Sequence, residues 1–339
     1  MIKPKHLKKG DKVALVSLSS GGMGEEKSKK RLETTLENLK KIFALEPITM
    51  PNALTGKKKL YEHPELRAKD LMDAFKDESI KAIISFTGGD DTIRLLPYID
   101  FDIIKNNPKI FIGFSDTTAN HFMMYKAGLI SYYGPAAGVE FSKKTVFQEN
   151  IDTVVNTLFK PKSDLELPSY NYVVNDPQDE AFEHFETSAN DKGYEIIQGG
   201  GIVEGRLLGG CIELFQMTNG TSIWPEPEEW ENKVLFVETS EDKPNIEYVK
   251  YTFYNLGAQG ILDNLNGILI GRPKDGVYYD EYNQVIKEVT RLFGREDLPI
   301  VSNCHFGHAW LWHILPIGET IRIDCENKKL TLVEEPTEK

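Results

Sequence analysis

Short apolar runs alternate with amphipathic segments along the first 127 residues, and this alternation constrains the fold more than any other feature. The runs 13–18, 81–86 and 109–114 predict strands, and the segments 26–43, 64–75, 91–98 and 117–127 predict helices. Within 26–43, leucine and phenylalanine recur every three or four residues, which predicts a helix with one buried face. Strands that alternate with helices are typical of a parallel sheet covered on both faces. We therefore expect an α/β fold with an N-terminal domain over residues 1–160.

The composition changes after that domain. Between Ser163 and Ile196 there are nine acidic residues and one lysine, with aromatic residues that include Phe182 and Phe185. Loops of this length are commonly lids or binding loops. We expect residues 161–198 to form a linker or a substrate-covering loop, the plainer alternative being an acidic, solvated linker.

Residues 199–339 are expected to form a C-terminal domain of mixed α/β type. The predicted strands are 233–238, 267–271 and 299–304, the predicted helices are 246–256 and 281–293, and a short helix is expected near 211–218. A meander of strands at 312–315, 320–324 and 330–333 is expected at the end of the chain.

The charge and the apolar pattern exclude several kinds of partner. A net charge of −12 argues against nucleic acid, because binding to phosphates requires a concentrated basic surface. The basic N-terminus lacks the apolar stretch of a signal peptide, and no window has about 18 uninterrupted apolar residues. We therefore expect a cytoplasmic protein without a membrane partner. Cys211, Cys304 and Cys325 are widely spaced, which predicts reduced core thiols.

Small residues follow three of the predicted strands. These segments are 19–22, 87–90 and 113–116. Ligands of open parallel sheets bind beyond the carboxyl ends of the strands, where glycine lets backbone approach closely. No phosphate-binding glycine motif and no His-Glu-x-x-His motif occurs, so we expect neither a nucleotide cofactor nor a metal.

Ser115 is the candidate nucleophile. The strand expected at 109–114 breaks at Gly113, presents this serine and leads into the helix expected from Thr117. A strand, a tight turn and a helix in that order form a nucleophile elbow, where backbone N–H groups can face a developing oxyanion. Thr117 stands where Gly-x-Ser-x-Gly has its second glycine, so a small residue that merely ends a buried strand is the alternative.

A serine nucleophile needs a base, and the base needs a group that orients it. His305 and His308 both follow the strand expected at 299–304, and His308, which comes after a glycine, is the better candidate. Glu238 ends the apolar strand 233–238, where a carboxylate is buried unless something uses it. The alternative for Glu238 is a polar residue that caps the strand end.

The motifs Gly-Phe-Ser-Asp-Thr-Thr at 113–118, Leu-Phe-Val-Glu at 235–238 and Phe-Gly-His at 306–308 resemble the LD-carboxypeptidase family of serine peptidases. Further matches lie at 7–11, 87–90, 94–100, 205–210 and 315–318. The resemblance implies a Rossmann-like or flavodoxin-like N-terminal domain that carries the serine and a C-terminal domain that carries the glutamate and the histidine. It also implies a homodimer and no metal or cofactor.

By the same resemblance, Ser115 is the nucleophile, His308 is the general base and then the acid, and Glu238 orients His308. The N–H groups of Asp116 and Gly89 are the candidates for the oxyanion hole.

The family contains murein tetrapeptide carboxypeptidases and microcin C immunity proteins, which cleave aminoacyl or peptidyl groups from a modified adenylate. The long 163–196 segment and Cys211-Ile212, where Asn-Leu is expected in the murein enzymes, favour the immunity type. The alternatives are a murein tetrapeptide LD-carboxypeptidase and a non-catalytic protein of the same fold that binds a small ligand.

Overall fold

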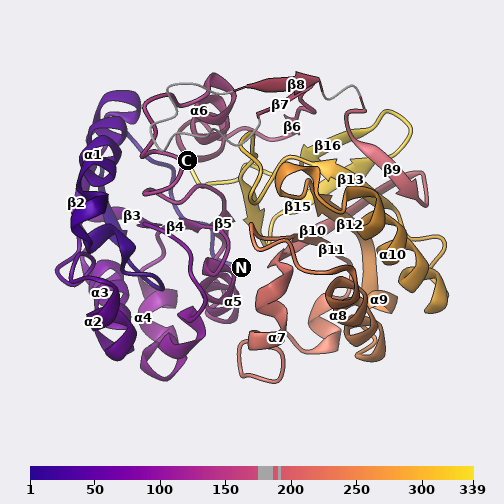
Figure 1. Cartoon of the computed structure of the whole chain (residues 1–339), viewed down its shortest axis with the longest axis horizontal. Helices are drawn as coiled ribbons and strands as arrows, with labels where there is room; N and C mark the ends of the chain where they lie inside the picture. The colour runs from indigo at the N-terminus through magenta and orange to yellow at the C-terminus, as the bar shows by residue number, and fades with distance from the viewer. Residues whose placement is uncertain (175–185, 190–191) are drawn as a thin grey trace. The chain divides into compact units, whose positions relative to one another are not determined.

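The computed structural model describes residues 1–174, 186–189 and 192–339, which separate into two compact units. Of the described residues, the first unit comprises Met1–Pro161 and Pro336–Lys339, and the second comprises those between 162 and 335 (Figure 1). Ser115 belongs to the first unit, whereas Glu238 and His308 belong to the second.

A parallel sheet forms the centre of the first unit. Its strands are β1 (Lys12–Val16), β2 (Glu46–Thr49), β3 (Ile80–Ser85), β4 (Ile110–Gly113) and β5 (Ser131–Tyr133). Its α-helices are α1 (Lys29–Phe43), α2 (Lys57–Glu62), α3 (Pro64–Lys76), α4 (Phe101–Asn106), α5 (Thr117–Lys126) and α6 (Gln148–Val154). The 3-10 helices η1 (Gly22–Gly24), η2 (Glu26–Ser28) and η3 (Thr92–Tyr98) and the π-helix η4 (Val155–Phe159) complete the unit. These strands follow the order β2-β1-β3-β4-β5, and all neighbours are parallel. The order is that of a flavodoxin-like sheet, which confirms the expected fold class.

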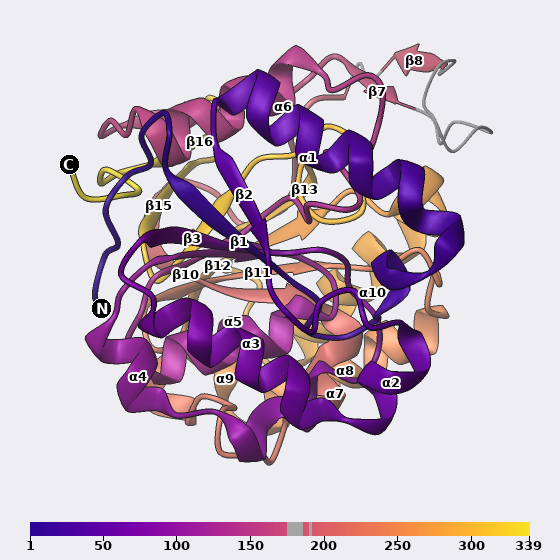
Figure 2. The ribbon, with the colours of Figure 1, turned by 90° about the vertical axis from the view of Figure 1, so that its left-hand side faces the viewer.

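Helices cover both faces of this sheet, with α1 on one face and α3, α4 and α5 on the other (Figure 2). The buried face of α1 contains Leu39 and Phe43, as the spacing predicts. The helix expected at 91–98 is the 3-10 turn η3, which contains Pro97. Proline lacks the N–H that an α-helix requires and therefore disfavours a regular helix here.

The glycine-containing loops after β1 and β3 meet at the carboxyl end of the sheet. The strand order reverses between these two strands, which is where open α/β sheets bind ligands. The N–H of Ser20 donates to the carbonyl of Gly88 over 3.2 Å, which ties the two loops together. The grouping of small strand-end loops that the sequence predicts is therefore confirmed for this pair.

A mixed sheet forms the centre of the second unit. The strands of the unit are β6 (Leu165–Leu167), β7 (Tyr172–Val174), β8 (Thr187–Ala189), β9 (Glu195–Gln198), β10 (Ile202–Cys211), β11 (Lys233–Glu238), β12 (Leu265–Gly271), β13 (Ile300–Cys304), β14 (Leu315–Ile317), β15 (Thr320–Asp324) and β16 (Lys329–Leu332). Its helices and turns are η5 (Ile212–Leu214), α7 (Phe215–Thr218), η6 (Pro227–Trp230), α8 (Ile246–Ala258), α9 (Ile261–Asn264), η7 (Lys274–Gly276) and α10 (Tyr279–Leu292).

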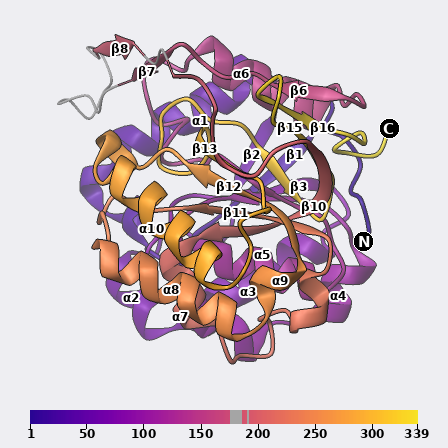
Figure 3. The same cartoon turned by 90° about the vertical axis from the view of Figure 1, so that its right-hand side faces the viewer.

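The sheet of the second unit has the order β6-β16-β15-β10-β11-β12-β13-β9. Strands β10 to β13 are parallel, and the outer pairs are antiparallel. This confirms the expectation of a mixed domain. Helix α8 lies beside α9 and α10 (Figure 3).

Three features differ from the sequence pattern or add to it. Strand β10 was not predicted, because Gly205, Gly209 and Gly210 obscure it; a side chain at Gly209 would overlap the carbonyl of Phe236 on the neighbouring strand. The strand expected at 312–315 is wrong, since β14 begins at Leu315. In the described parts of the segment 163–196 the structure has the short strands β6, β7 and β8 and the start of β9, whereas Phe182 and Phe185 lie outside the described residues.

The three cysteines are buried and none of them forms a disulfide, as expected. Within the described ranges, no helix is long and apolar enough to cross a membrane.

Candidate active site

Ser115 occupies a strained turn between β4 and α5. Its φ is +61°, in the left-handed region that costs a residue with a Cβ about 1–2 kcal/mol. The turn is held because the Ser115 N–H donates to the Tyr133 hydroxyl over 3.1 Å and its carbonyl accepts from the N–H of Thr118 over 2.9 Å. The Ser115 hydroxyl makes no hydrogen bond to the described residues of its own unit. Such a turn is typical of a nucleophile elbow.

Gly113 and Thr117 explain how the elbow forms without a second glycine. A Cβ on Gly113 would lie 2.8 Å from the Thr117 Cγ2 atom. The strand end and the helix start can therefore approach this closely only because residue 113 has no side chain. The Thr117 side chain is buried against this glycine. Tight packing of the helix start against the strand end therefore requires glycine at position 113.

The loop after β3 passes directly beside the serine. A Cβ on Gly88 would lie 2.9 Å from the Ser115 hydroxyl oxygen, so only glycine fits there. The N–H groups of Gly89 and Asp116 have no hydrogen-bond partner among the residues that the structure describes. Free N–H groups next to a serine hydroxyl can stabilise an oxyanion.

The carboxylate of Asp116 fixes this loop to the elbow. Its Oδ2 atom accepts the N–H groups of Asp91 and Thr92 at 3.1 and 2.9 Å. Asp91 in turn forms a bidentate ion pair with the buried Arg67, at 2.6 and 3.0 Å. Burial raises the pKa of the Asp116 carboxyl group. The elbow and the glycine loop are therefore held together by a buried polar network.

In the second unit, Glu238 and His308 form a close pair. The Nδ1–H of His308 donates to the Oε2 atom of Glu238 over 2.7 Å, and the Glu238 side chain is 0% exposed. Glu238 ends β11, and His308 lies in the loop after β13. Gly307 has a φ of +81°, and a side chain at this position would overlap that of Glu238. The two sequence candidates are thus brought together at the carboxyl ends of parallel strands.

His305, the other candidate base, has a different environment. Its Nε2 atom accepts the N–H of Tyr170 over 3.1 Å, and its ring lies 4.8 Å from the Tyr170 ring. Burial lowers the pKa of His305 to about 3, so the imidazole is neutral. His305 therefore binds the backbone at Tyr170, whereas His308 pairs with Glu238.

Glu241 is a site residue that the sequence reasoning missed. Its Oε2 atom lies 2.8 Å from the Nε2 atom of His308, so both ring nitrogens face carboxylates. Only the imidazolium can donate to both. Although burial opposes the charge, Glu238 and Glu241 raise the pKa of His308 to about 10. The hydrogen bond from His308 lowers the pKa of Glu241 to about 2. The available signal was an acidic residue three positions after Glu238.

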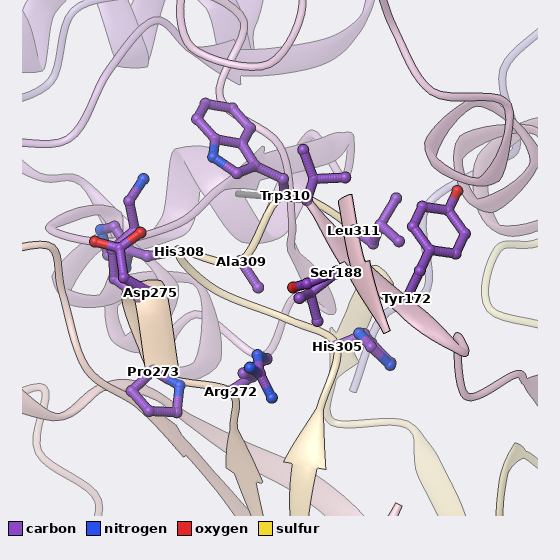
Figure 4. A pocket seen from close by; sticks show the side chains of 13 residues that line it. Tyr172, Ser188, Arg272, Pro273, Asp275, His305, His308, Ala309, Trp310 and Leu311 are labelled. Carbon is purple, nitrogen blue, oxygen red and sulfur yellow. The ribbon is translucent and has the colours of Figure 1, made fainter. Parts of the chain in front are cut away.

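A pocket of the second unit lies next to His308 (Figure 4). Its lining residues are Tyr172, Val173, Val174, Ser188, Arg272, Pro273, Lys274, Asp275, His305, His308, Ala309, Trp310 and Leu311. No group of three or more metal-binding side chains is found in the described part of the chain. The arrangement can bind and orient an organic substrate beside an imidazole.

Comparisons with known proteins agree with this geometry. Residues 13–134 match the model of the LD-carboxypeptidase N-terminal domain, and residues 204–323 match that of its C-terminal domain. A solved structure, an MccF-like protein from Streptococcus pneumoniae in complex with AMP, superposes with a TM-score of 0.87 at 31% identity, covering 95% of this chain and 98% of the other.

Three curated relatives extend the comparison. A putative carboxypeptidase of Treponema pallidum is 32% identical over 78% of this chain and 76% of its own length. The microcin C7 self-immunity protein MccF of Escherichia coli is 29% identical over 83% of each chain. The probable murein peptide carboxypeptidase of Bacillus subtilis is 27% identical over 96% of this chain and 92% of its own. This chain therefore belongs to the LD-carboxypeptidase family and is a serine-type carboxypeptidase or amide hydrolase.

Proposed function

We propose that the protein hydrolyses an amide-type bond through an acyl-enzyme formed on Ser115, with His308 as general base and then acid and Glu238 as the group that orients it. The 2.7 Å hydrogen bond between His308 and Glu238 is the observation that carries the proposal. It fixes the tautomer that leaves Nε2 for proton transfer once Glu241 is displaced. The strained turn at Ser115 supports the role of the serine.

The reaction follows from these roles. Nε2 of His308 takes the hydroxyl proton as the Ser115 oxygen attacks the substrate carbonyl, which requires the two atoms to come within hydrogen-bond reach. The N–H groups of Gly89 and Asp116 stabilise the resulting oxyanion. His308 then returns the proton to the leaving nitrogen, and the C–N bond breaks. A water molecule, deprotonated by His308, hydrolyses the ester and restores Ser115.

For the substrate, we propose an aminoacyl or peptidyl nucleotide, as in the microcin C immunity type. The Escherichia coli relative is a microcin immunity protein, and the Streptococcus pneumoniae structure was solved with AMP. The name of the first supports the immunity type, and the AMP bound to the second supports a nucleotide portion in the leaving group.

A murein tetrapeptide is the second candidate substrate. The Bacillus subtilis relative bears the name of a murein peptide carboxypeptidase and matches 96% of this chain. In that case Ser115 attacks the carbonyl that precedes the terminal D-amino acid, and the leaving group is that amino acid.

The test measures hydrolysis of an aminoacyl sulfamoyl adenosine and of a murein tetrapeptide side by side. Ser115→Ala should reduce turnover of the true substrate by at least about 10⁴-fold while the protein stays folded. Normal cleavage by that variant would refute the mechanism. A serine-directed covalent probe addresses the non-catalytic alternative, because a protein that only binds ligand should form no adduct that depends on His308.

The homodimer, the cytoplasmic location and the independence from cofactors stay predictions. Light scattering of the purified protein, cell fractionation and activity after treatment with a chelator check them in turn.

A further inference from the structure

Arg272 is a half-buried cation without a carboxylate partner in the described part of the chain. Arg272 follows Gly271, the last residue of β12, and its N–H donates to the carbonyl of Cys304 over 2.8 Å, which anchors it next to His305. Its Nη1 donates to the Asn303 side-chain oxygen over 2.9 Å. Burial lowers the pKa of Arg272, so a counter-charge there would stabilise the guanidinium.

The neighbouring acidic groups already have other partners. Glu195 accepts the Tyr279 hydroxyl and lies 3.6 Å from Lys192. Its charge favours the charged form of Arg272, but the two side chains form no direct ion pair. Asp275, on the pocket wall, pairs with Lys243 at 2.7 Å. By contrast, the fully buried Arg67 of the first unit has its own carboxylate. Arg272 is thus a cation of this pocket that no carboxylate of the described residues pairs with directly.

The pocket combines this charge with a second cation and aromatic side chains. Lys274 Nζ lies 4.8 Å from the centre of the Trp310 ring. Arg272, His308, Trp310 and Tyr172 line the same pocket (Figure 4). His305, which also lines it, is neutral and adds no charge. A guanidinium presents N–H groups in a planar fork that matches the two oxygens of a carboxylate or phosphate.

We propose that Arg272 is the anion-binding residue of this pocket and holds a carboxylate or phosphate group of the substrate beside His308. The proposal rests on the proposed function, because it assigns the pocket to the substrate of that reaction. The shared chemistry is an oxyanion: the phosphate of a nucleotide or the terminal carboxylate of a peptide. Arg272 binds and orients the substrate and takes no part in proton transfer.

The experiment measures binding by calorimetry to the full chain that carries Ser115→Ala, so that no substrate is consumed. One arm compares AMP with adenosine, and the other compares a murein tetrapeptide with its C-terminal amide. In one arm, the ligand that carries the phosphate or the terminal carboxylate should bind about 10- to 100-fold more tightly than the counterpart that lacks this group. The arm that shows this difference identifies the source of the oxyanion.

Arg272→Gln should abolish that difference, and Arg272→Lys should retain part of it. Lys192→Gln is the matched control, because Lys192 lies 5.3 Å from the centre of the same Tyr279 ring but does not line the pocket. Arg272→Gln also removes the hydrogen bond to Asn303, so thermal unfolding checks that this variant stays folded. Lys274→Gln removes a different positive charge from the pocket and leaves the hydrogen bond between Arg272 and Asn303 in place.

The proposal is overturned if Arg272→Gln leaves this ratio of affinities unchanged. It is also overturned if neither ligand binds more tightly than the counterpart that lacks the phosphate or the terminal carboxylate. Because this readout is binding and the test of Ser115 is turnover, either proposal can fail alone.

Discussion

Glu241 and His308 are joined by a hydrogen bond of 2.8 Å at the ring nitrogen that a general base must leave open. With Glu238 at the other nitrogen, this contact holds the imidazolium form and raises the pKa of His308 to about 10. The Glu241 side chain is 65% exposed, so it has room to turn away into solvent. In the proposed mechanism, Glu241 must therefore leave His308 before Nε2 can accept a proton.

Glu241→Gln should shift the acidic limb of the kcat/KM profile to lower pH by about 1–2 units and raise activity near pH 7. The sign follows because a general base works unprotonated and loss of a carboxylate lowers the pKa of His308. Glu238 stays in place, and the pocket charges of Arg272, Lys274 and Asp275 are unchanged in the variant.

Glu247→Gln, an exposed carboxylate at the start of α8, is the control and should leave the limb unmoved. An unshifted limb in Glu241→Gln would show that Glu241 does not hold the proton on His308.

The backbone strain at Ser115 predicts a stability difference between two inactive variants. Ser115→Gly should be about 1 kcal/mol more stable than Ser115→Ala, because glycine adopts a φ of +61° without the steric cost of a Cβ. Urea unfolding measures the two free energies. Ala127→Gly, at a φ of −71°, should have the opposite sign and lose stability. Equal stability of the two serine variants would contradict the account of a strained elbow.

Helices and strands can be predicted from the sequence where the apolar residues form a continuous run or recur at a regular spacing. Strand β11 has the predicted bounds, because Val234 to Val237 are apolar and buried on a parallel sheet. Strand β10 was missed because its glycines interrupt the apolar pattern. Gly209 is needed because the backbone of the neighbouring strand β11 lies close to it, and this contact is not visible in the local sequence.

The same reasoning applies to the site. Glu238 and His308 could be predicted, because Glu238 ends a buried strand, His308 follows another, and the carboxyl ends of parallel strands meet at one edge of the sheet. Glu241 could not, since its position depends on the turn after β11, where the Ser240 N–H donates to the Glu213 side chain over 2.9 Å. The charge of Arg272 is likewise visible in the sequence, whereas its lack of a carboxylate partner is a property of the folded unit.

Even a methyl group at position 88 should reduce activity. In Gly88→Ala the new Cβ would lie 2.9 Å from both the Cβ and the hydroxyl oxygen of Ser115, so one of them must move. A displacement of the nucleophile on this scale should lower kcat/KM by about 10²-fold. Gly200→Ala is the control, because no atom lies within 4 Å of its new Cβ. Steady-state kinetics with either candidate substrate measures the effect, and equal rates for the two variants would argue against close packing of the loop on Ser115.

The last prediction concerns the pH dependence of the free energy of unfolding and His121, a buried residue of α5 that contacts the strand end before Ser115. Its Nε2–H donates to the carbonyl of Gly113 over 2.9 Å, and its Nδ1 lies 2.8 Å from the Ser131 hydroxyl. Burial lowers the pKa of His121 to about 4, so the folded protein holds it neutral while the unfolded chain binds a proton near pH 6.5.

Because the unfolded state then binds more protons between pH 4 and 6.5, stability falls as the pH is lowered through this window. From pH 7.5 to pH 5, His121 alone should account for a loss of about 2 kcal/mol in the free energy of unfolding. His121→Gln should remove that share of the pH dependence even though it lowers stability at pH 7.5, and His63→Gln, at an exposed position, should leave the dependence intact. Urea unfolding at the two pH values measures both. An unchanged pH dependence in His121→Gln would mean that this histidine is not held neutral beneath Ser115.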